Sequence, residues 1–500
     1  MCKIGILFEN RDFEHDVYEL IKAFYPEAEI HTLYENTEAE YDLRFSVERD
    51  NDSYIIKYER TENLSKQETE QKGVISADIL SKENAGCGIQ DAHALRKENK
   101  DNIKYALYQL LIKLTGRTLP WGNLTGIRPA KLAMGMIESG MKNTEAAREM
   151  RERYLVSPQK TALAITIANR EREILKDIDY ENGYSLYIGI PFCPSICLYC
   201  SFSSYPLKVW EKRTDEYVEA LCREVRETAL MMKGRKLDTI YIGGGTPTTL
   251  LPHQIRKLLD TVGEAFGYEG LAEFTVEAGR PDSITREKLE VLRKWGITRI
   301  SINPQTMQQR TLDLIGRRHS VEQTVESFKI ARELGFDDIN MDLIMGLPEE
   351  SLEDVRDTLE QIMQLKPDNL TVHSLALKRA ARLNMFKEDY KDYKMVNTQE
   401  HMDLTASYAK KMDLFPYYLY RQKNMAGNFE NVGYSLPGKA CIYNILIMEE
   451  MQTIAACGAG TTTKVVFPSE NRRERCENVK EVEQYISRIG EMIQRKERIL

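Results

Sequence analysis

The sequence predicts an α/β protein built on a partial parallel (β/α)6-type barrel, with a small N-terminal α/β domain and a C-terminal α+β region. Two observations support this fold class. From Leu186 onward, strand-like and helix-like runs alternate at regular spacing, which is typical of parallel strands joined by crossover helices. Most polar and glycine-rich motifs of this part lie at or just past the end of a predicted strand, where parallel barrels collect their reactive groups.

Residues 1–120 are expected to form the small N-terminal domain. Its predicted elements are a strand at Lys3–Phe8, a helix at Asp16–Tyr25, a strand at Glu29–Tyr34, a hairpin at Tyr41–Glu59 that turns at 50–52, and an amphipathic helix at Asn102–Leu114. The polar stretch 60–100 predicts loops. No catalytic constellation is visible in this domain.

Residues 121–180 are expected to be a helical connector, in which Pro129 can start a helix. The run around Trp121 and Gly122 predicts a packing corner. Residues 181–384 then form the barrel. Its predicted strands are Leu186–Ile190, Thr239–Ile242, Glu273–Glu277, Arg299–Ile302, Asp338–Ile344 and Asn369–His373, and its predicted helices are Asp215–Met231, Pro252–Phe266, Arg286–Trp295, Val321–Leu334 and Leu352–Leu365.

Residues 385–500 are expected to form a C-terminal region that covers the substrate. This region starts with a predicted helix at Thr398–Met412 and an aromatic run at Phe415–Tyr420. A glycine-rich loop follows at 457–461, and a charged helix at Val479–Ile499 closes the chain.

Composition limits the possible functions. The chain has 500 residues, 42% of them hydrophobic and 29% charged, which is ordinary for a globular protein of two or three domains. A net charge of −8 argues against a general nucleic-acid binder. Since no apolar run approaches about 20 residues, no membrane span is expected. Six of the nine cysteines are expected to be plain thiols and not disulfide partners, which indicates the reducing cytoplasm: Cys2, Cys87, Cys222, Cys441, Cys457 and Cys476.

The most specific motif is a set of three cysteines, Cys193, Cys197 and Cys200, directly after a strand-like run. A tight loop can turn three thiolates toward one centre, and thiolates select iron–sulfur clusters, zinc or copper(I). Structural zinc would need a fourth cysteine or histidine nearby, and the next histidine is His253. A 4Fe–4S cluster held by three cysteines would leave one iron open for chemistry.

Further motifs follow the next strands of the predicted barrel. Gly243–Thr248 is a glycine-rich turn, where a ligand can approach the backbone closely. Glu277 ends a strand, and its carboxylate could accept hydrogen bonds from ribose hydroxyls. Gln305, Arg317 and Asp342 stand at or beyond later strands. Each of these is weak evidence alone, since ordinary turns and surface residues look the same.

Together these motifs resemble those of radical S-adenosylmethionine enzymes, in particular the oxygen-independent coproporphyrinogen III oxidases and their haem-chaperone relatives. The resemblance is strong from Leu186 to about Leu375. It is carried by Tyr-Ile-x-Ile-Pro-Phe-Cys, Gly-Gly-Gly-Thr-Pro-Thr, Arg-Ile-Ser-x-x-x-Gln, Gly-Arg-x-His and Asp-Leu-Ile-x-Gly-Leu-Pro. In the C-terminal region, Tyr420–Asn428 and Ala455–Thr461 resemble the HemZ-type coproporphyrinogen dehydrogenase subgroup.

The resemblance implies two cofactors, a 4Fe–4S cluster on the three cysteines and S-adenosylmethionine, of which two molecules share the site in the oxidases. By motif, Tyr187, Gly244 and Glu277 would contact the cluster-bound molecule. The residues that would contact one or other of the two molecules are Tyr199, Ser201, Gly245, Thr246, Gln305, Arg317, Asp342 and, less directly, Ala376.

Two departures from the family pattern matter for function. The well-known oxidases have a further cysteine two residues after the triplet, and Phe202 stands there instead. The usual Glu-x-Asn/Asp-Pro run reads Glu-Ala-Gly-Arg-Pro at Glu277–Pro281. The first departure also occurs in the haem-chaperone branch, whereas the long N-terminal extension does not fit that branch.

The resemblance implies oxidative decarboxylation of two propionates of coproporphyrinogen III, giving protoporphyrinogen IX. Hydrogen abstraction by a 5′-deoxyadenosyl radical needs no general base, so no catalytic side chain is predicted. A substrate with four carboxylates calls for cations, for which the candidates are Lys378, Arg379, Arg382, Arg421, Lys423 and Lys439. A low-potential electron donor is also implied. The alternatives are a haem carrier and, against the acidic balance, a radical enzyme that acts on RNA.

Overall fold

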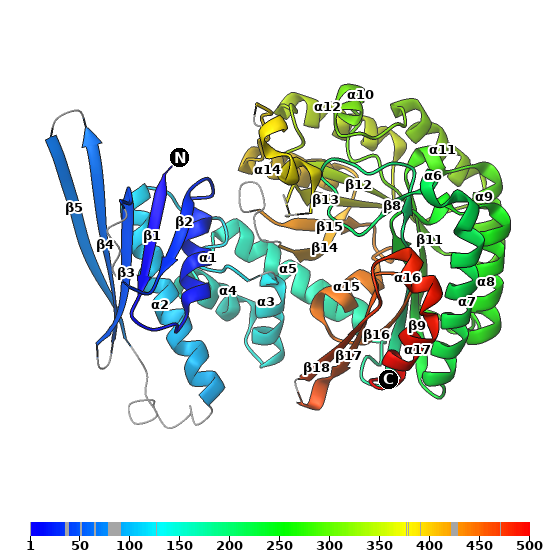
Figure 1. The fold of residues 1–500 in the computed structure, drawn as a ribbon, viewed down its shortest axis with the longest axis horizontal. Coiled ribbons are helices and arrows are strands. Elements are labelled where there is room, and N and C mark those ends of the chain that lie inside the picture. Colours follow the sequence, from blue (N-terminus) through cyan, green and yellow to red (C-terminus); the bar gives the residue numbers. More distant parts are fainter. Residues whose placement is uncertain are drawn as a thin grey trace. The chain divides into compact units, whose positions relative to one another are not determined.

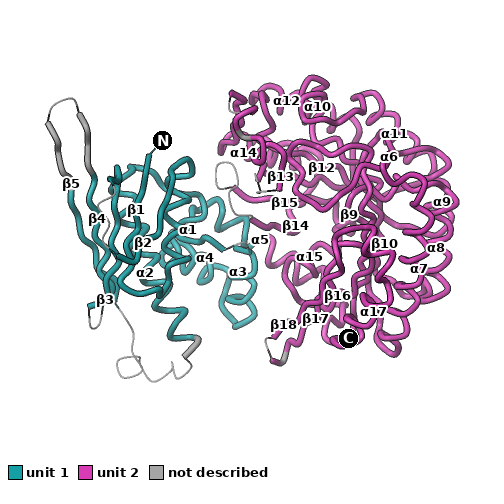
Figure 2. The backbone as a smooth tube through the Cα atoms, in the orientation of Figure 1, with its two compact units in different colours: residues 1–165 teal, residues 166–500 magenta. Residues whose placement is uncertain are grey.

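The chain divides into two units, residues 1–165 and 166–500 (Figure 2). This computed structural model describes residues 2–35, 40–50, 53–64, 67–78, 92–126, 128–376, 378, 380–390, 392–421, 429–470 and 472–500. The expected connector of residues 121–180 is shared between the units, and the expected C-terminal region lies in the same unit as the barrel. No helix among these described residues is long and apolar enough to cross a membrane.

Unit 1 contains a five-stranded sheet in the order β2-β1-β3-β4-β5. Its strands are β1 (Lys3–Phe8), β2 (Glu29–Leu33), β3 (Leu43–Asp50), β4 (Ser53–Leu64) and β5 (Gln67–Asp78). Strand β1 is parallel to both of its neighbours, and the other pairs are antiparallel. The predicted small α/β domain is confirmed as a fold. Residues 51–52 of the expected turn lie outside the described residues.

The expectation of loops over residues 60–100 is wrong for residues 60–64, 67–78 and 92–100, and residues 65–66 and 79–91 lie outside the described residues. Strand β4 runs on to Leu64, β5 follows, and helix α2 already begins at Ala92. Polar composition misled the prediction because β5 is an edge strand, whose described side chains alternate between exposed positions such as Lys72 and Val74 and more buried ones such as Ile75 and Ala77. A strand of this kind needs few apolar residues.

The helices of unit 1 supply most of its remaining core. They are α1 (Glu14–Phe24), α2 (Ala92–Thr115), α3 (Pro129–Glu138) and α4 (Asn143–Glu152), and α5 (Pro158–Leu175) continues into unit 2. Trp121 is fully buried. Gly122 next to it has φ +56°, and a Cβ there would lie 2.1 Å from the carbonyl oxygen of Tyr154. The Trp-Gly run is therefore a packing corner, as predicted.

Unit 2 is organised around an eleven-stranded sheet in the order β14-β15-β13-β12-β11-β10-β9-β6-β16-β17-β18. The six predicted strands are present as β6 (Gly183–Ile190), β9 (Lys236–Gly244), β10 (Glu273–Gly279), β11 (Arg299–Ile302), β12 (Ile339–Met345) and β13 (Asn369–Ser374). Each is parallel to its neighbours within this group. The predicted (β/α)6-type partial barrel is confirmed.

Helices connect these parallel strands and, as Figure 1 shows for α7 to α9, run along their outer side. The helices of the barrel part are α6 (Leu207–Trp210), α7 (Thr214–Met231), α8 (Pro252–Phe266), α9 (Arg286–Lys294), α10 (Gln309–Leu314), α11 (Val321–Glu333) and α12 (Leu352–Leu365). Two short strands, β7 (Phe192–Cys193) and β8 (Tyr205–Pro206), pair with each other beside the large sheet.

The C-terminal region adds strands to both ends of the parallel group. At one end, β14 (Phe415–Tyr420) and β15 (Asn431–Ser435) continue the sheet antiparallel to β13. At the other end, β16 (Thr453–Cys457) pairs parallel with β6, and β17 (Thr462–Phe467) and β18 (Arg472–Glu477) follow as antiparallel strands. A seventh parallel strand therefore comes from a part of the chain about 270 residues away from β6.

The C-terminal region also contains helices α13 (Arg382–Met385), α14 (Gln399–Lys411), α15 (Ile442–Glu449), α16 (Val482–Ser487) and α17 (Ile489–Glu497). The single charged helix expected at Val479–Ile499 is wrong, since the chain breaks between α16 and α17 at Arg488, where φ is −112° and ψ is 22°. This break lets Tyr485 and Met492, one on each helix, both reach the core.

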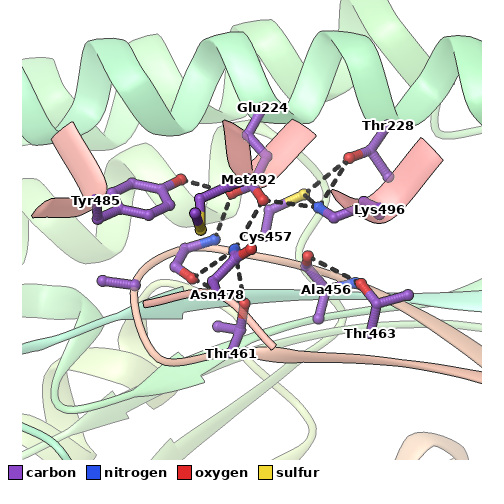
Figure 3. Close-up of polar contacts among 12 residues, drawn as sticks. Glu224, Thr228, Ala456, Cys457, Thr461, Thr463, Asn478, Tyr485, Met492 and Lys496 are labelled. Atoms are coloured by element: carbon purple, nitrogen blue, oxygen red, sulfur yellow. Dashed lines mark hydrogen bonds and ion pairs between the residues drawn. The ribbon is translucent and has the colours of Figure 1, made fainter. Parts of the chain in front are cut away.

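A buried polar network joins helix α17 to α7 and to the turn after β16 (Figure 3). The Lys496 ammonium donates to Glu224 Oε1 at 2.8 Å and lies 3.6 Å from Cys457 Sγ. The Glu224 carboxylate also accepts hydrogen bonds from Gly458 N (2.7 Å), Asn478 Nδ2 (2.7 Å) and Tyr485 OH (2.5 Å). Lys496 and Glu224 are 1% and 0% exposed, so the charges are paired where water cannot reach them.

This network holds the turn after β16 against strand β6. Tyr217 OH donates to the Gly189 carbonyl at 2.7 Å and accepts from Ala459 N. A Cβ on Gly458 would lie 2.3 Å from the Gly189 oxygen, so only glycine fits this approach. Gly189 lies four residues before Cys193. The C-terminal helices therefore support the start of the cysteine loop.

Candidate functional site

A cavity of about 360 Å³ opens at the carboxyl ends of the parallel strands of unit 2. All three cysteines of the motif line it. The wall also contains these residues of the predicted cofactor set: Tyr199, Ser201, Gly244, Gly245, Thr246, Glu277, Gln305, Arg317, Asp342 and Ala376. Side chains alternate between the two faces of a strand. Most strand positions that line this cavity are polar or aromatic, with Ile344 on β12 as an aliphatic exception, whereas neighbouring positions such as Ile240 and Leu343 are fully buried.

Tyr187 of the predicted set does not line the cavity itself. Its ring stacks on Tyr241, with centroids 6.1 Å apart, and on Tyr443 at the same separation. Tyr241 does line the cavity, so Tyr187 stands behind the wall in a stack of tyrosines.

The cysteine loop begins at the end of β6 and is pinned by the glycine-rich turn. Gly245 N donates to the Ile190 carbonyl, and Thr246 N donates to the Phe192 carbonyl, both at 2.7 Å. A Cβ on Gly245 would lie 2.6 Å from the Phe192 oxygen and 3.0 Å from Cys193 Sγ. The turn therefore needs glycine for close packing under the loop, besides any contact with a ligand.

The three thiols fit a cluster of iron and sulfur. Cys193 and Cys197 are buried, and Cys200 is half-buried. Burial raises the pKa of Cys193 and raises that of Cys200 to about 11, so both are protonated at neutral pH until metal displaces the proton. Among the described residues, no three His, Cys, Asp or Glu side chains are arranged around a single metal-ion position. A 4Fe–4S cluster needs no such convergence, because each cysteine binds a different iron.

Glu277 lies two residues before the end of β10 and lines the cavity. Burial raises the pKa of this carboxyl group to about 7, the hydrogen bond from Tyr241 OH at 2.5 Å lowers it in part, and the nearby Asp342 raises it further. The group can therefore exchange a proton near neutral pH. It is placed to accept hydrogen bonds from hydroxyl groups of a ligand in the cavity.

Asp342 lies on β12, which is separated from β10 by one strand of the sheet, and it lines the same cavity as Glu277. Burial opposes its charge, but His373 at 3.8 Å and a hydrogen bond from Asn340 Nδ2 at 2.7 Å outweigh burial and lower its pKa. His373 also lies 3.4 Å from Tyr420 OH. The sequence reasoning missed His373, although the alternation of β13 could have found it, since Thr371 and His373 share the face that lines the cavity.

Gln305 and Arg317 enter the cavity from the segment after β11. Gln305 has φ +71°, and its backbone bridges β12 through Asp342 and Ile344. Its side-chain oxygen is buried without a hydrogen-bond donor among the described residues. Arg317 donates to Tyr199 OH at 3.0 Å and to the Asn303 carbonyl at 2.8 Å. Arg317 therefore ties the aromatic residue of the cysteine motif to the barrel.

The candidate substrate cations are only partly placed. Arg379 and Lys423 lie outside the described residues. Lys378 lines the cavity, with its ammonium 5.9 Å from the Phe202 ring centroid. Arg382 begins α13 as an exposed residue outside the cavity wall.

Arg421 and Lys439 also stand away from the cavity wall. Burial lowers the pKa of Arg421 to about 10, and Lys439 pairs with Asp337 at 3.1 Å. Two cavity arginines, Arg280 and Arg299, were missed by the sequence reasoning. The positively charged side chains that line the cavity are therefore only partly those that the sequence suggested.

Comparison with known proteins agrees with this geometry. Residues 187–362 match the family model of the radical SAM superfamily. The chain is 38% identical over 441 residues to the oxygen-independent coproporphyrinogen-III oxidase-like protein HemZ of Bacillus subtilis, covering 85% of this chain and 87% of that one. It is a radical SAM protein of the coproporphyrinogen III oxidase family. The expected family is confirmed.

Other members of this family are similar over shorter spans. The heme chaperone HemW of Bacillus subtilis is 39% identical over 192 residues, which is 38% of this chain and 50% of that protein. The crystal structure of the Escherichia coli coproporphyrinogen III oxidase HemN, described as a radical SAM enzyme, aligns with a TM-score of 0.50 at 24% identity, over 65% of this chain and 72% of that one. That likeness supports the fold.

Membership of the radical SAM family establishes the cofactors, a 4Fe–4S cluster and S-adenosylmethionine. The residues of the cavity wall are of the chemical types that both cofactors need. Its wall holds three thiols for iron, and it holds a buried amide oxygen on Gln305 that lacks a donor among the described residues. The backbone at Gly244, with φ +108°, is accessible to a ligand.

Proposed function

We propose that this protein oxidatively decarboxylates two propionate side chains of coproporphyrinogen III, without oxygen, to give protoporphyrinogen IX. The observation that carries this proposal is the gathering of the three cysteines and nearly all of the predicted cofactor residues on one cavity wall. The 38% identity to HemZ over most of both chains supports it. Each propionate loses one hydrogen atom, one carbon dioxide and one electron to become a vinyl group.

Under this proposal, the cofactors supply the 5′-deoxyadenosyl radical that removes the hydrogen atom, and the chain binds and orients the reactants. Cys193, Cys197 and Cys200 would hold the cluster. Gly244 and Glu277 would contact the S-adenosylmethionine bound to it, with Tyr187 supporting that wall from behind. The other predicted residues of the wall would contact this molecule or a second one.

The substrate side of the proposal rests on Lys378 and Phe202. Lys378 lines the cavity, and Phe202 beside it is 72% exposed. A cation next to an exposed aromatic ring suits a substrate that combines pyrrole rings with carboxylates. The neighbouring Arg379 is a further candidate for the same carboxylates. The electron donor and the electron acceptor for the second half of the reaction are partner proteins or small carriers.

A second candidate function is haem binding and transfer. It is favoured by the similarity to the heme chaperone HemW and by Phe202, which stands where the oxidases have a further cysteine. In this case the protein would bind haem with defined stoichiometry and release it to an acceptor.

One anaerobic experiment separates the two functions. The cluster is reconstituted, reductant, S-adenosylmethionine and coproporphyrinogen III are added, and the porphyrin products are separated by chromatography. Tricarboxylic and dicarboxylic products together with 5′-deoxyadenosine establish the decarboxylase. Cofactor cleavage without decarboxylation, combined with stoichiometric haem binding, refutes it in favour of the carrier.

The matched variants are Cys197→Ala and Cys222→Ala. Both cysteines are buried free thiols, but Cys222 lies on α7 and is outside the cavity wall. We expect Cys197→Ala to abolish products and Cys222→Ala to keep them. Equal activity of the two variants would show that the cluster is held elsewhere.

A further inference from the structure

We infer that Arg280 is a positioning residue that donates a hydrogen bond to the cluster-bound sulfur of Cys197 and thereby raises the reduction potential of the cluster. The inference rests on cluster ligation by the three cysteines, as proposed above. It does not depend on which substrate the protein uses.

The starting point is the departure from the family pattern at Glu277–Pro281. Strand β10 changes register against β11 between Glu277 and Gly279, so that Ala278 is an extra residue on β10. Gly279 then takes φ +67°. A bulge of this kind re-aims the residues that follow it. Here it directs Arg280 from the end of the strand into the cavity wall beneath the cysteine loop.

The Arg280 guanidinium is held rigidly and is 4% exposed. Asp282 accepts from Nε at 3.0 Å and from Nη2 at 2.6 Å, a two-point contact that fixes the plane of the group. The remaining nitrogen, Nη1, faces the cysteine loop. It donates to the carbonyl and hydroxyl oxygens of Ser195, at 2.9 and 2.8 Å, and lies 3.8 Å from Cys197 Sγ.

The charge of this group follows from its partners. Burial opposes a positive charge on Arg280, but Asp282 and the neighbouring thiols outweigh burial and raise its pKa. At longer range the Asp282 carboxylate cancels most of this charge. At the sulfur of Cys197, however, the near N–H groups dominate, because Asp282 binds the opposite edge of the guanidinium.

The effect on the cluster has a definite sign. Reduction adds an electron, and part of the added negative charge resides on the cysteine sulfurs. A hydrogen bond to sulfur stabilises this reduced form and raises the potential. Removing the donor lowers the potential, whereas removing the Asp282 charge leaves the Arg280 charge uncompensated and raises it.

The test measures the potential of the reconstituted full-length protein by redox titration, following the electron paramagnetic resonance signal of the reduced cluster. The variants are Arg280→Gln, Arg280→Lys and Asp282→Asn, each with iron and sulfide content determined. At a fixed potential we expect the ratio of reduced to oxidised cluster in Arg280→Gln to be about ten-fold lower than in the parent, a shift of about 59 mV for one electron. The potential of Arg280→Lys should lie between those of Arg280→Gln and the parent, and the potential of Asp282→Asn should lie above that of the parent.

Shifts of the potential in opposite directions for Arg280→Gln and Asp282→Asn indicate an electrostatic effect on the cluster. If the two residues had only a structural role, both substitutions would shift the potential in the same direction. Equal potentials in all cluster-loaded variants, or shifts of one sign, would overturn the inference. If Arg280→Gln fails to retain iron, Asp282→Asn decides: a potential that is not above that of the parent overturns it. The titration contains no substrate, so failure of the proposed decarboxylation leaves this outcome unchanged.

Discussion

Replacing Lys496 by methionine tests how the C-terminal helix supports the cysteine loop. Methionine keeps most of the side-chain volume but removes the charge that pairs with Glu224 at 2.8 Å. Breaking a buried ion pair by removing one partner costs about 3–5 kcal/mol, because the other charge stays buried. Glu224 keeps hydrogen bonds from Gly458, Asn478 and Tyr485. The expected loss is therefore at the lower end, about 3 kcal/mol.

Hydrogen exchange measured by mass spectrometry on the cluster-free protein gives this cost locally, from the protection of peptides in α7, β16 and α17. Glu224→Gln combined with Lys496→Met removes the unpaired charge. The double variant should therefore be more stable than Lys496→Met alone by about 1 kcal/mol or more. Lys176→Met is the control, because Lys176 pairs with Glu173 on an exposed surface and its loss should leave protection unchanged.

Two results would refute this reasoning. One is a loss below about 1 kcal/mol in Lys496→Met, which would mean that the pair contributes no more than a surface pair. The other is a double variant whose loss equals the sum of the two single losses, which would mean that the two charges do not interact. If the reasoning holds, Lys496→Met should also bind less iron on reconstitution, since Gly189 and the cysteine loop lose their support.

Three further predictions follow from single residues. Gly458→Ala should lower iron content and stability, because Gly458 has φ +112° and a Cβ there would lie 2.3 Å from the Gly189 oxygen. Iron assay and urea unfolding measure the two effects. The control is Gly438→Ala, which has open space around the new Cβ and should lose less stability and keep full iron content. Binding of S-adenosylmethionine to the cluster-loaded protein, measured by anaerobic calorimetry, should tighten from pH 6 to pH 8, because burial raises the pKa of Glu277 to about 7 and only the carboxylate accepts hydrogen bonds at both oxygens. Glu277→Gln should weaken binding about ten-fold and remove this pH dependence. An unchanged pH dependence in Glu277→Gln would contradict the role of Glu277 in binding. Burial also raises the pKa of Glu350 to about 7 from 4.5, so its proton is held more tightly in the folded state. The stability that this proton contributes is present below about pH 4.5 and is lost as the pH rises through 7. In urea unfolding, the free energy of unfolding of the parent should decrease by on the order of 2–3 kcal/mol between pH 5 and pH 8, and Glu350→Gln should remove this decrease.

The order of the barrel elements could be predicted from the sequence because each strand and helix has a local signature. The runs at Leu186–Ile190 and Asn369–His373 are apolar and β-branched between polar turns, and the structure has strands there. Strand pairing across long separations leaves no such signature. The pairing of β16 with β6 depends on the close approach of Gly458 to Gly189 and could not be read from either segment.

The candidate site, too, could be predicted from the sequence only in part. The sequence singled out Cys193, Cys197 and Cys200 as candidate cluster ligands because they lie within eight residues of one loop, and the resemblance of several motifs in order indicated the family. The tertiary structure alone decided that Arg280 reaches Cys197, that His373 faces Asp342, and that Lys496 closes a network behind the loop. These contacts join residues between 31 and 272 positions apart in the chain. Their energies depend on burial and distance, which become defined only when the barrel has closed around them.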